Sequence, residues 1–459
     1  MTAVQPGSAT LLAILRGLHQ QRIDLSLDRM RRLLTALGNP EQRLPPVIHV
    51  AGTNAKGSLI AFLRAVLEAD GRRVHSYHSP PLHSLHDSVR LASGAGASES
   101  ISEVQLAALL ARVLAANGNA PLTSFEGETA AALLGFAGTS ADVVLLETGM
   151  GGRLDATNVV ARPALTVLTP IGIDHADFLG STLSEIATEK AGILKPGTPC
   201  IVARQLPEAL DRLRTIAANL RVQLIEHGQD WDAYEQHGRL VYQDENGLLD
   251  LPLPNLMGRH QIDNAGLAVA VALRMGALAP GESALAQGLT RANWPGRLHR
   301  LPRNGLCAVL PDASELWLDG GHNAAAAAVI AQAMAEMEDR APKPLHLVLG
   351  MLQSKRLDVY LKPFRGIARS VTGILLPDVS RAYAGPHPPA DIVNAAEAEG
   401  IFSQPAASIT DALAAIAVRA NAKPVRVLIC GSLHLAGSAL TADAAAVAAA
   451  NRTGLAGGG

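Results

Sequence analysis

Cysteine is scarce in this sequence of 459 residues, and the three cysteines that occur, Cys200, Cys307 and Cys430, lie far apart. An odd number of distant cysteines supports neither a disulfide framework nor a zinc site built from closely spaced thiolates. We therefore expect a protein of a reducing compartment. The start of the chain lacks the basic region and the cleavage site of an export signal, so the sequence predicts a cytoplasmic location.

An excess of charge of either sign is also absent. Lysine and arginine together number 39 and the acidic residues 41, which gives a formal net charge of −2, and no basic run stands out. Such a chain has no field that attracts phosphodiester backbones, so we expect no nucleic-acid partner. No stretch approaches the roughly 20 apolar residues of a membrane helix, and the alanine-rich segment 323–335 is too short, so we expect no membrane partner.

Apolar residues are abundant. They make up 48% of the chain, against 17% charged residues, which is enough material for large buried cores. A chain of this length exceeds one ordinary core, so we expect two domains. Proline and glycine punctuate the segment 294–297 just before a new series of strands and helices begins. We therefore place one domain at residues 1–297 and a second at residues 298–459.

Short runs of valine, isoleucine and leucine alternate with longer helical patterns, which predicts an α/β fold with mostly parallel sheets. The polar stretch 227–254 predicts a β-hairpin. Open parallel sheets bind ligands at the carboxyl ends of their strands, so we expect the functional site there. The expected strands are 46–50, 142–147, 164–169, 198–202, 315–318, 344–349 and 426–429, and the clearest helices are 60–69 and 324–337.

A loop of small residues follows the first predicted strand and leads into a helix. Backbone N–H groups of such a loop cradle phosphate, a lysine neutralises β/γ-phosphate charge, and a hydroxyl binds magnesium. Lys56 and Ser58 supply the last two groups. The alternative is an ordinary turn with a solvated lysine. The expected ATP-binding loop is Gly52, Thr53, Asn54, Ala55, Lys56, Gly57 and Ser58.

This loop resembles the phosphate loop of the Mur ligase superfamily. The folate branch, which contains the folylpolyglutamate synthases and the bifunctional dihydrofolate synthases, has similar blocks in the same order from about residue 10 to residue 437. The resemblance implies an N-terminal P-loop ATPase-type domain with a mostly parallel sheet and a smaller Rossmann-like α/β domain after it. The other similar blocks are 23–29, 79–80, 125–126, 151–158, 174–175, 189–193, 294–297, 319–323 and 431–433.

The resemblance also implies the metal ligands. Glu147 closes an apolar strand and His175 follows another strand, so both can converge with Ser58 on magnesium, although either residue fits a structural role equally well. Similar proteins carry a carbamylated lysine at the position of Lys190, and the carbamate can hold a second magnesium ion. The alternative is that Lys190 is a surface lysine paired with a nearby glutamate. The expected metal ligands are thus Ser58, Glu147, His175 and Lys190, and the catalytic residues are Lys56, His175 and Lys190.

Four further residues are expected to bind ATP on the same grounds. Asn264 matches the segment that approaches the adenine, with a helix N-cap as the competing explanation. Arg297 matches an arginine that reaches the phosphates, and its alternative is an ion-paired residue of a linker. Asp319 ends a predicted strand and His322 follows in a glycine-containing turn, so the second domain is expected to contribute these two groups.

The folate-binding residues rest on the resemblance alone, because a flat slot for a pteroate ring has no sharp sequence signature. Asp155 is the expected partner of the pterin. Phe125 fits packing in the core equally well. The expected residues are Ser26, Leu27, Asp28, Arg29, Thr123, Ser124, Phe125, Glu126, Leu154, Asp155 and Ala156.

Together these features predict an ATP- and magnesium-dependent ligase. It would join L-glutamate to dihydropteroate, to (poly)glutamylated tetrahydrofolate, or to both, through an acyl phosphate. We expect a monomer whose partners are ATP, L-glutamate and the pterin substrates.

Three other functions share features with this sequence. A sister Mur ligase acting on a cell-wall precursor would carry a separate N-terminal domain, whereas here the phosphate loop begins by residue 52. A nucleotide-hydrolysing switch would need an Asn-Lys-x-Asp signature after its phosphate loop, and the sequence contains none. A catalytically impaired nucleotide- or folate-binding protein is suggested by Ala55, which stands where a glycine is usual and whose methyl group opposes a positive φ. Other departures from the family pattern are Pro81, Ser88, Gly321, Ala324 and His434.

Overall fold

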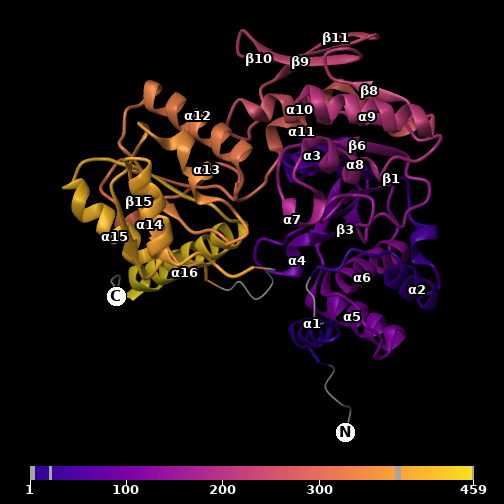
Figure 1. Cartoon of the computed structure of the whole chain (residues 1–459), viewed down its shortest axis with the longest axis horizontal. Helices are drawn as coiled ribbons and strands as arrows, with labels where there is room; N and C mark the ends of the chain where they lie inside the picture. The colour runs from indigo at the N-terminus through magenta and orange to yellow at the C-terminus, as the bar shows by residue number, and fades with distance from the viewer. Residues whose placement is uncertain (1–5, 20–22, 378–383, 457–459) are drawn as a thin grey trace. The chain divides into compact units, whose positions relative to one another are not determined.

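The computed structural model describes residues 6–19, 23–377 and 384–456 (Figure 1). The chain forms two compact units. One unit comprises Met1–Asn255 and Gln261–Asn293, and the other comprises Leu256–His260 and Trp294–Gly459. The division expected after residue 297 therefore lies slightly inside the second unit, and a short segment ahead of it also belongs to that unit.

The first unit is built on an eight-stranded sheet with the order β4-β3-β2-β5-β1-β6-β7-β8. The six strands from β2 to β8 in this order pair in parallel, and β3 and β4 add an antiparallel edge. The expected mostly parallel α/β sheet is confirmed. The strands are β1 (Val47–Ala51), β2 (Val74–Tyr77), β3 (Val89–Gly94), β4 (Ala97–Ser100), β5 (Val143–Glu147), β6 (Leu165–Leu168), β7 (Cys200–Val202) and β8 (Leu224–Glu226).

Helices bury this sheet. Every residue of β1 and β5 is buried, the pattern of central parallel strands covered on both faces. A Cβ at Gly288 would lie 2.3 Å from Cα of Val66, so this glycine allows α11 to pack directly against α3. The helices of the unit are α1 (Ser8–Gly17), α2 (Asp28–Ala36), α3 (Lys56–Ala69), α4 (Leu85–Ser88), α5 (Glu103–Asn117), α6 (Ser124–Gly138), α7 (Ala176–Leu179), α8 (Leu183–Ala191), α9 (Pro207–Leu220), α10 (His260–Leu273) and α11 (Glu282–Arg291).

The polar stretch 227–254 forms three antiparallel strands rather than the single hairpin that its sequence suggests. They are β9 (Trp231–Gln236), β10 (Arg239–Asp244) and β11 (Gly247–Pro252). Figure 1 shows this small sheet beside α10. A Cβ at Gly266 of α10 would lie 2.2 Å from Cβ of Ala233, so the missing side chain lets β9 approach the helix.

The second unit contains a six-stranded sheet with the order β12-β13-β17-β14-β15-β16, parallel except for β12. Alternate residues of β14 face two apolar clusters, one with α12 to α14 and one with α15 and α16. The elements are β12 (His299–Leu301), β13 (Glu315–Leu318), β14 (Leu345–Leu349), β15 (Ala368–Ile374), β16 (Ser403–Ala406), β17 (Arg426–Cys430), α12 (Ala324–Arg340), α13 (Leu357–Leu361), α14 (Pro389–Ala398), α15 (Ile409–Ala420) and α16 (Leu433–Ala456).

Helix α16 corrects one expectation. Its segment Leu433–Asn451 is long and apolar enough, by length and composition alone, to cross a membrane. Its first turns pack into the core of the second unit, where Leu435 and Ala439 are fully buried. The carboxylate of Asp443 is also buried and accepts a hydrogen bond from the N–H of Leu306. The abundance of alanine explains why the segment escaped notice as an apolar run.

Candidate active site

The phosphate loop connects β1 to α3 at the carboxyl edge of the first unit's sheet. Its first residue, Gly52, has φ +153°, and a Cβ there would lie 1.8 Å from Oγ1 of Thr169. Only glycine fits this position. Strand β1 lies between β5 and β6, and Val50 is the register partner of Glu147. The sheet therefore brings the loop next to the ends of the two strands from which the expected metal ligands come.

The side chain of Lys56 folds back over the loop. Its Nζ donates to the carbonyl groups of Gly52 and Thr53, at 3.1 and 3.3 Å. Its Nζ also lies 3.8 Å from Oε1 of Glu147, and the two side chains are only 14% and 5% exposed. A solvated lysine on an ordinary turn does not describe this arrangement. Ser58, in the first turn of α3, is buried as well.

Ala55 adopts the conformation that its methyl group was expected to oppose. The residue caps α3 with φ +70° and ψ −12°, in the left-handed region. The loop thus keeps its form without a glycine, at a strain that we place at about 1 kcal/mol from the general cost of this region for residues with a side chain. The loop therefore adopts a positive φ at Ala55 although the methyl group opposes it.

His175 follows the connection between β6 and α7. It has φ +52°, its N–H donates to the carboxylate of Asp174 at 2.9 Å, and its Nε2 lies 3.9 Å from the other oxygen of that carboxylate. The connection is bonded to the phosphate loop, because Pro170 accepts hydrogen bonds from the N–H groups of Thr53 and Asn54. His175 is therefore tied through the backbone to the segment that carries Lys56.

Lys190 is not a surface residue. It lies at the end of α8, is 4% exposed, and its Nζ donates to the carbonyl of Gly52 at 2.8 Å. Burial lowers the pKa of Lys190 to about 7, and the nearby positive charge of Lys56 acts in the same direction, against Asp174 and Asp155. Burial therefore favours the neutral amine of Lys190 over its charged form. Pairing with a neighbouring glutamate is excluded.

The two glutamates considered as partners of that lysine have other contacts. Glu189 forms an ion pair with Arg153 at 2.8 Å, and Glu185 accepts hydrogen bonds from Ser181 and Thr182 at the start of α8. The carboxylates of both glutamates therefore bind partners other than Lys190. The site around Lys190 is therefore formed by the phosphate loop rather than by the surface of α8.

The donor set at this edge fits magnesium. Magnesium is held in nucleotide sites by one or two protein oxygens together with phosphate oxygens and water. The buried carboxylate of Glu147, beside the phosphate loop, and the buried hydroxyl of Ser58 supply hard oxygens of this kind. Among the described residues no group of three or more His, Cys, Asp or Glu could hold a metal ion by itself. A metal here would need the phosphates of the nucleotide.

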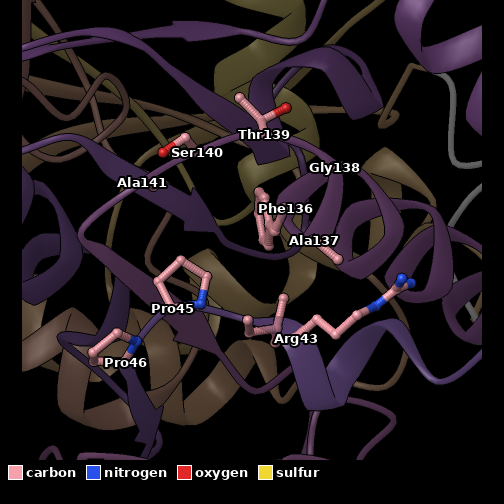
Figure 2. Close-up of a pocket in the computed structure, with 10 residues that line it drawn as sticks. Arg43, Pro45, Pro46, Phe136, Ala137, Gly138, Thr139, Ser140 and Ala141 are labelled. Atoms are coloured by element: carbon pink, nitrogen blue, oxygen red, sulfur yellow. The ribbon is translucent and has the colours of Figure 1, made fainter.

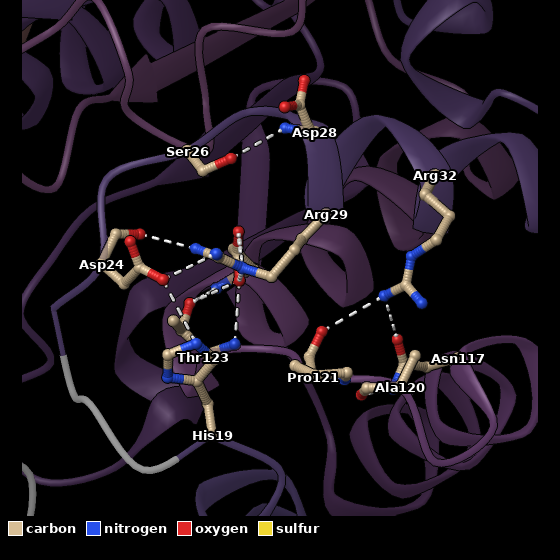
Figure 3. Close-up of polar contacts among 11 residues, drawn as sticks. His19, Asp24, Ser26, Asp28, Arg29, Arg32, Asn117, Ala120, Pro121 and Thr123 are labelled. Carbon is tan, nitrogen blue, oxygen red and sulfur yellow. Dashed lines mark hydrogen bonds and ion pairs between the residues drawn. The ribbon is translucent and has the colours of Figure 1, made fainter.

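Two of the segments expected to bind folate meet in one polar network (Figure 3). Nε of Arg29 donates to both carboxylate oxygens of Glu126 at 3.1 and 3.0 Å, and its Nη1 donates to Asp24 at 2.8 Å. Glu126 also closes a capping box with Thr123 at the start of α6. Ser26 accepts a hydrogen bond from the N–H of Asp28. The charges of Arg29 and Glu126 are thus largely satisfied by each other.

Phe125 links this network to the carboxyl end of β5. Its ring stacks on Tyr77 with centroids 6.3 Å apart. A Cβ at Gly149, two residues after Glu147, would lie 2.4 Å from the ring. The aromatic side chain is partly buried against the core of α1, α2, α5 and α6. The expectation that Phe125 packs in the core is therefore supported. Its ring also lies beside Gly149, just after β5, so a role in folate binding stays a prediction.

Asp155, the expected partner of the pterin, is buried, and its carboxylate accepts hydrogen bonds from nearby residues of the protein. One carboxylate oxygen accepts from the N–H of Met150, and the other accepts from both the N–H and the hydroxyl of Thr157. The hydroxyl of Thr157 also contacts Nε2 of His49 at 2.9 Å. Burial raises the pKa of Asp155 and lowers that of His49 to about 3. The sequence did not mark His49 because a single histidine in a strand has no signature.

The second unit brings its own expected residues together. Asp319, at the end of β13, accepts hydrogen bonds from the N–H groups of Leu298 and Gly321, and burial raises its pKa although Arg297 lowers it. Nδ1 of His322 donates to the carbonyl of Gly320, and a Cβ at Gly320 would lie 2.9 Å from the guanidinium of Arg297. Arg297, Asp319 and His322 thus surround one turn.

Asn264 is placed in the first unit. It lies inside α10, which begins at His260, so the N-cap explanation is wrong. Its amide donates to the side chain of Gln261 at 3.0 Å, and Asn264 is buried. Nothing in this geometry tests its role with adenine, which remains a prediction.

A separate cavity has a volume of about 400 Å³. Figure 2 shows the residues that line it. Residues 43–46 and 136–141 line it, and these precede β1 and β5 or close α6. It therefore lies at the amino ends of the strands, whereas the expected site lies at their carboxyl ends. The sequence did not indicate it.

The fold and the residues at its carboxyl edge define a Mur-type nucleotide-dependent ligase. Residues 50–272 match the family model of the Mur ligase middle domain, and residues 308–442 match that of the dihydrofolate synthetase C-terminal domain. A dihydrofolate synthase/folylpolyglutamate synthase of Bacillus subtilis is 34% identical over 363 residues, which cover 75% of this chain and 80% of that protein. The chain belongs to the dihydrofolate synthase/folylpolyglutamate synthase family, whose members are ATP-dependent ligases.

Solved structures agree with this assignment. Escherichia coli FolC in complex with DHPP and ADP is 30% identical, with a TM-score of 0.82 over 97% of this chain and 99% of that chain. A bifunctional folylpolyglutamate synthase/dihydrofolate synthase with Mn, AMPPNP and L-glutamate bound is 29% identical, with a TM-score of 0.80 over 95% of this chain and 98% of that chain. The two-unit architecture is therefore that of the family.

Proposed function

We propose that this protein joins L-glutamate to dihydropteroate and to (poly)glutamylated tetrahydrofolate through an acyl phosphate. The observation that carries the proposal is a cluster at one phosphate loop: Lys56 and Lys190 both donate to the carbonyl of Gly52, and Glu147 forms an ion pair with Lys56. The relatives support the choice of substrates, because FolC of Escherichia coli is solved with DHPP and ADP and a further relative with AMPPNP and L-glutamate.

Each residue of the loop has a role in this proposal. Backbone N–H groups at the start of α3 hold the phosphates, and Lys56 neutralises the charge that develops on the γ-phosphate as the acceptor carboxylate attacks it. The amine of glutamate then attacks the acyl carbon, and phosphate leaves. Asn264 would contact the adenine, and Arg297, Asp319 and His322 would contact ATP from the second unit. His175 is a candidate acceptor for the proton that the amine loses.

Ser58, Glu147 and His175 would hold a first magnesium ion, and carbamylated Lys190 would help to hold a second. Bound magnesium supplies charge neutralisation at the transferring phosphoryl group. The low pKa of Lys190 supports carbamylation, because only a neutral amine adds to carbon dioxide, releasing one proton as the carbamate forms. Incubation with ¹³C-bicarbonate should then give a carbamate ¹³C signal that is absent in Lys190→Met.

Substrate trials test the function directly. Purified protein receives ATP, magnesium and L-glutamate with either dihydropteroate or a tetrahydrofolate, and the products are identified by mass. Both acceptors should gain glutamate. Extension of a cell-wall precursor with neither pterin glutamylated would favour the sister Mur ligase, and nucleotide binding without any product would favour an impaired binding protein.

We also propose that the protein is a monomer located in the cytoplasm. Gel filtration of the same sample tests the oligomeric state, and cell fractionation tests the location.

A further inference from the structure

Gln205 lies in the connection between β7 and α9, and no sequence motif marks it. Its carboxamide reaches the connection between β6 and α7, at residues 169–175. Oε1 accepts a hydrogen bond from the N–H of Ile171 at 2.9 Å, and Nε2 donates to the carbonyl of Thr169 at 3.0 Å. A longer contact of 3.5 Å joins Nε2 to the carbonyl of Leu168. One side chain thus binds both a donor and an acceptor of the same short segment.

The other side of this segment is bonded to the phosphate loop. The carbonyl of Pro170 accepts from two N–H groups of the loop at 3.0 and 3.2 Å. The hydroxyl of Thr53 exchanges two hydrogen bonds of 3.0 Å with the backbone of Gly172. The hydroxyl of Thr169 donates to the carbonyl of Asn54 at 2.6 Å. Residues 169–172 are therefore held between the phosphate loop and the side chain of Gln205.

The choice of side chain has a physical reason. Residues 169–172 belong to neither a helix nor a strand, so their backbone groups need partners outside regular structure. A carboxamide offers a donor and an acceptor at its end without a charge, and glutamine is long enough to reach from the neighbouring connection. A glutamate would turn an oxygen toward the carbonyl of Thr169, and an apolar side chain would leave the N–H of Ile171 without this partner.

We propose that Gln205 is a positioning residue of the ATP and metal site. By fixing residues 169–172 against the phosphate loop, it sets the place of His175, which follows three residues later, and supports the form of the loop itself. In this proposal, Gln205 itself contacts neither phosphate nor metal. The proposal rests on the proposed function, because the role of His175 as a metal ligand belongs to that function.

The test replaces the carboxamide by an apolar side chain of similar length, Gln205→Met. Affinity for Mn²⁺ is measured by electron paramagnetic resonance in the presence of AMPPNP, and should fall roughly tenfold, the usual effect of removing a partner that orients a metal ligand. Amide hydrogen exchange of the unliganded protein should rise in residues 169–175. The matched control is Gln223→Met, at an exposed glutamine of the same unit, which should change neither measurement.

A conservative variant separates positioning from general destabilisation. Gln205→Glu keeps the acceptor for the N–H of Ile171 but sets a carboxylate oxygen against the carbonyl of Thr169, so its Mn²⁺ affinity should also fall below that of the wild type. A lower melting temperature with unchanged Mn²⁺ affinity and unchanged exchange at residues 169–175 would overturn the proposal, because it would assign Gln205 a structural role only.

Different results would contradict the positioning role of Gln205 and the proposed function. If the wild type glutamylates its acceptor and Gln205→Met binds Mn²⁺ equally well, the positioning role is wrong while the proposed function stands. If the wild type binds no Mn²⁺ with AMPPNP, the proposed function is wrong, and the metal-positioning role falls with it.

Discussion

The ammonium group of Lys56 lies 3.8 Å from the carboxylate of Glu147, and the two side chains are 14% and 5% exposed. The lysine starts α3 and the glutamate ends β5, so two residues that are far apart in the sequence meet at one edge of the sheet. Opposite charges interact more strongly where water is scarce. The pair therefore joins the group expected to bind the γ-phosphate to the group expected to bind the metal.

Replacement of Lys56 by methionine should abolish most of the ligase activity. We expect turnover of ATP and glutamate to fall at least about 100-fold, the usual scale for loss of a group that stabilises charge in the transition state. The stability should also fall, because the carboxylate of Glu147 loses its ion-pair partner in a buried place. Steady-state kinetics and thermal unfolding measure the two effects. Lys362→Met, at an exposed lysine, is the control, and equal activity in both variants would contradict the role of Lys56.

Ala55→Gly should stabilise the protein slightly. The substitution relieves the left-handed strain at φ +70°, about 1 kcal/mol, and is partly offset by the greater freedom of glycine in the unfolded chain. We expect a gain between zero and about 1 kcal/mol in the free energy of unfolding. Ala65→Gly, within the same helix α3, should instead cost about 1 kcal/mol. Urea unfolding that gives the same loss for both variants would show that Ala55 is not strained.

Glu315→Gln should weaken the second unit in a pH-dependent way. Burial alone would raise the pKa of Glu315, but hydrogen bonds from Lys343, Arg426 and Trp317 lower it to about 2. A carboxylate with a lowered pKa stabilises the fold above its ordinary value of 4.5, and this stabilisation is lost as the pH falls from 4.5 toward 2.

The variant leaves the guanidinium of Arg426, which is 2% exposed, without its nearest carboxylate at 2.9 Å. We expect a loss of about 3 kcal/mol near neutral pH that shrinks in acid. Chemical unfolding at a series of pH values measures it, with Glu397→Gln, at an exposed glutamate of α14, as the control. A loss that is small and independent of pH would contradict the assignment.

Lys190→Met should change how stability depends on pH in buffer free of carbon dioxide. The pKa of Lys190 falls from 10.5 to about 7 in the fold, so between these values the unfolded chain binds more protons and the stability of the wild type rises with pH. The advantage of methionine should therefore shrink by about 1.4 kcal/mol per pH unit in this window. Lys423→Met, at an exposed lysine, is the control. A constant difference from pH 7 upward would show that Lys190 keeps its proton.

The sequence predicted the central elements well, because their signals are local. Runs of valine, isoleucine and leucine marked β1, β5, β6, β7, β13, β14 and β17, and the small-residue loop marked the phosphate site. The less apolar strands escaped notice. β2 carries His75 and Ser76 in buried positions, and the edge strand β4 is largely polar, so neither shows the usual pattern.

Other features depend on contacts between distant segments. Lys190 is buried against the phosphate loop and donates to Gly52, 138 residues away, and no local sequence pattern around α8 predicts this contact. The internal network of Asp155 with Thr157 and His49 is hidden for the same reason. The conformation of Ala55 is fixed by the surrounding loop, which overrides the ordinary preference of alanine.

Transfer of an oxygen atom tests the central claim most directly. Dihydropteroate with ¹⁸O in its carboxylate is incubated with the protein, ATP, magnesium and L-glutamate, and the phosphate released is examined by mass. An acyl phosphate requires an acceptor oxygen to attack the γ-phosphorus and to leave with phosphate, so each phosphate should carry one ¹⁸O for each glutamate added. Phosphate without ¹⁸O alongside a glutamylated product would contradict the acyl-phosphate route.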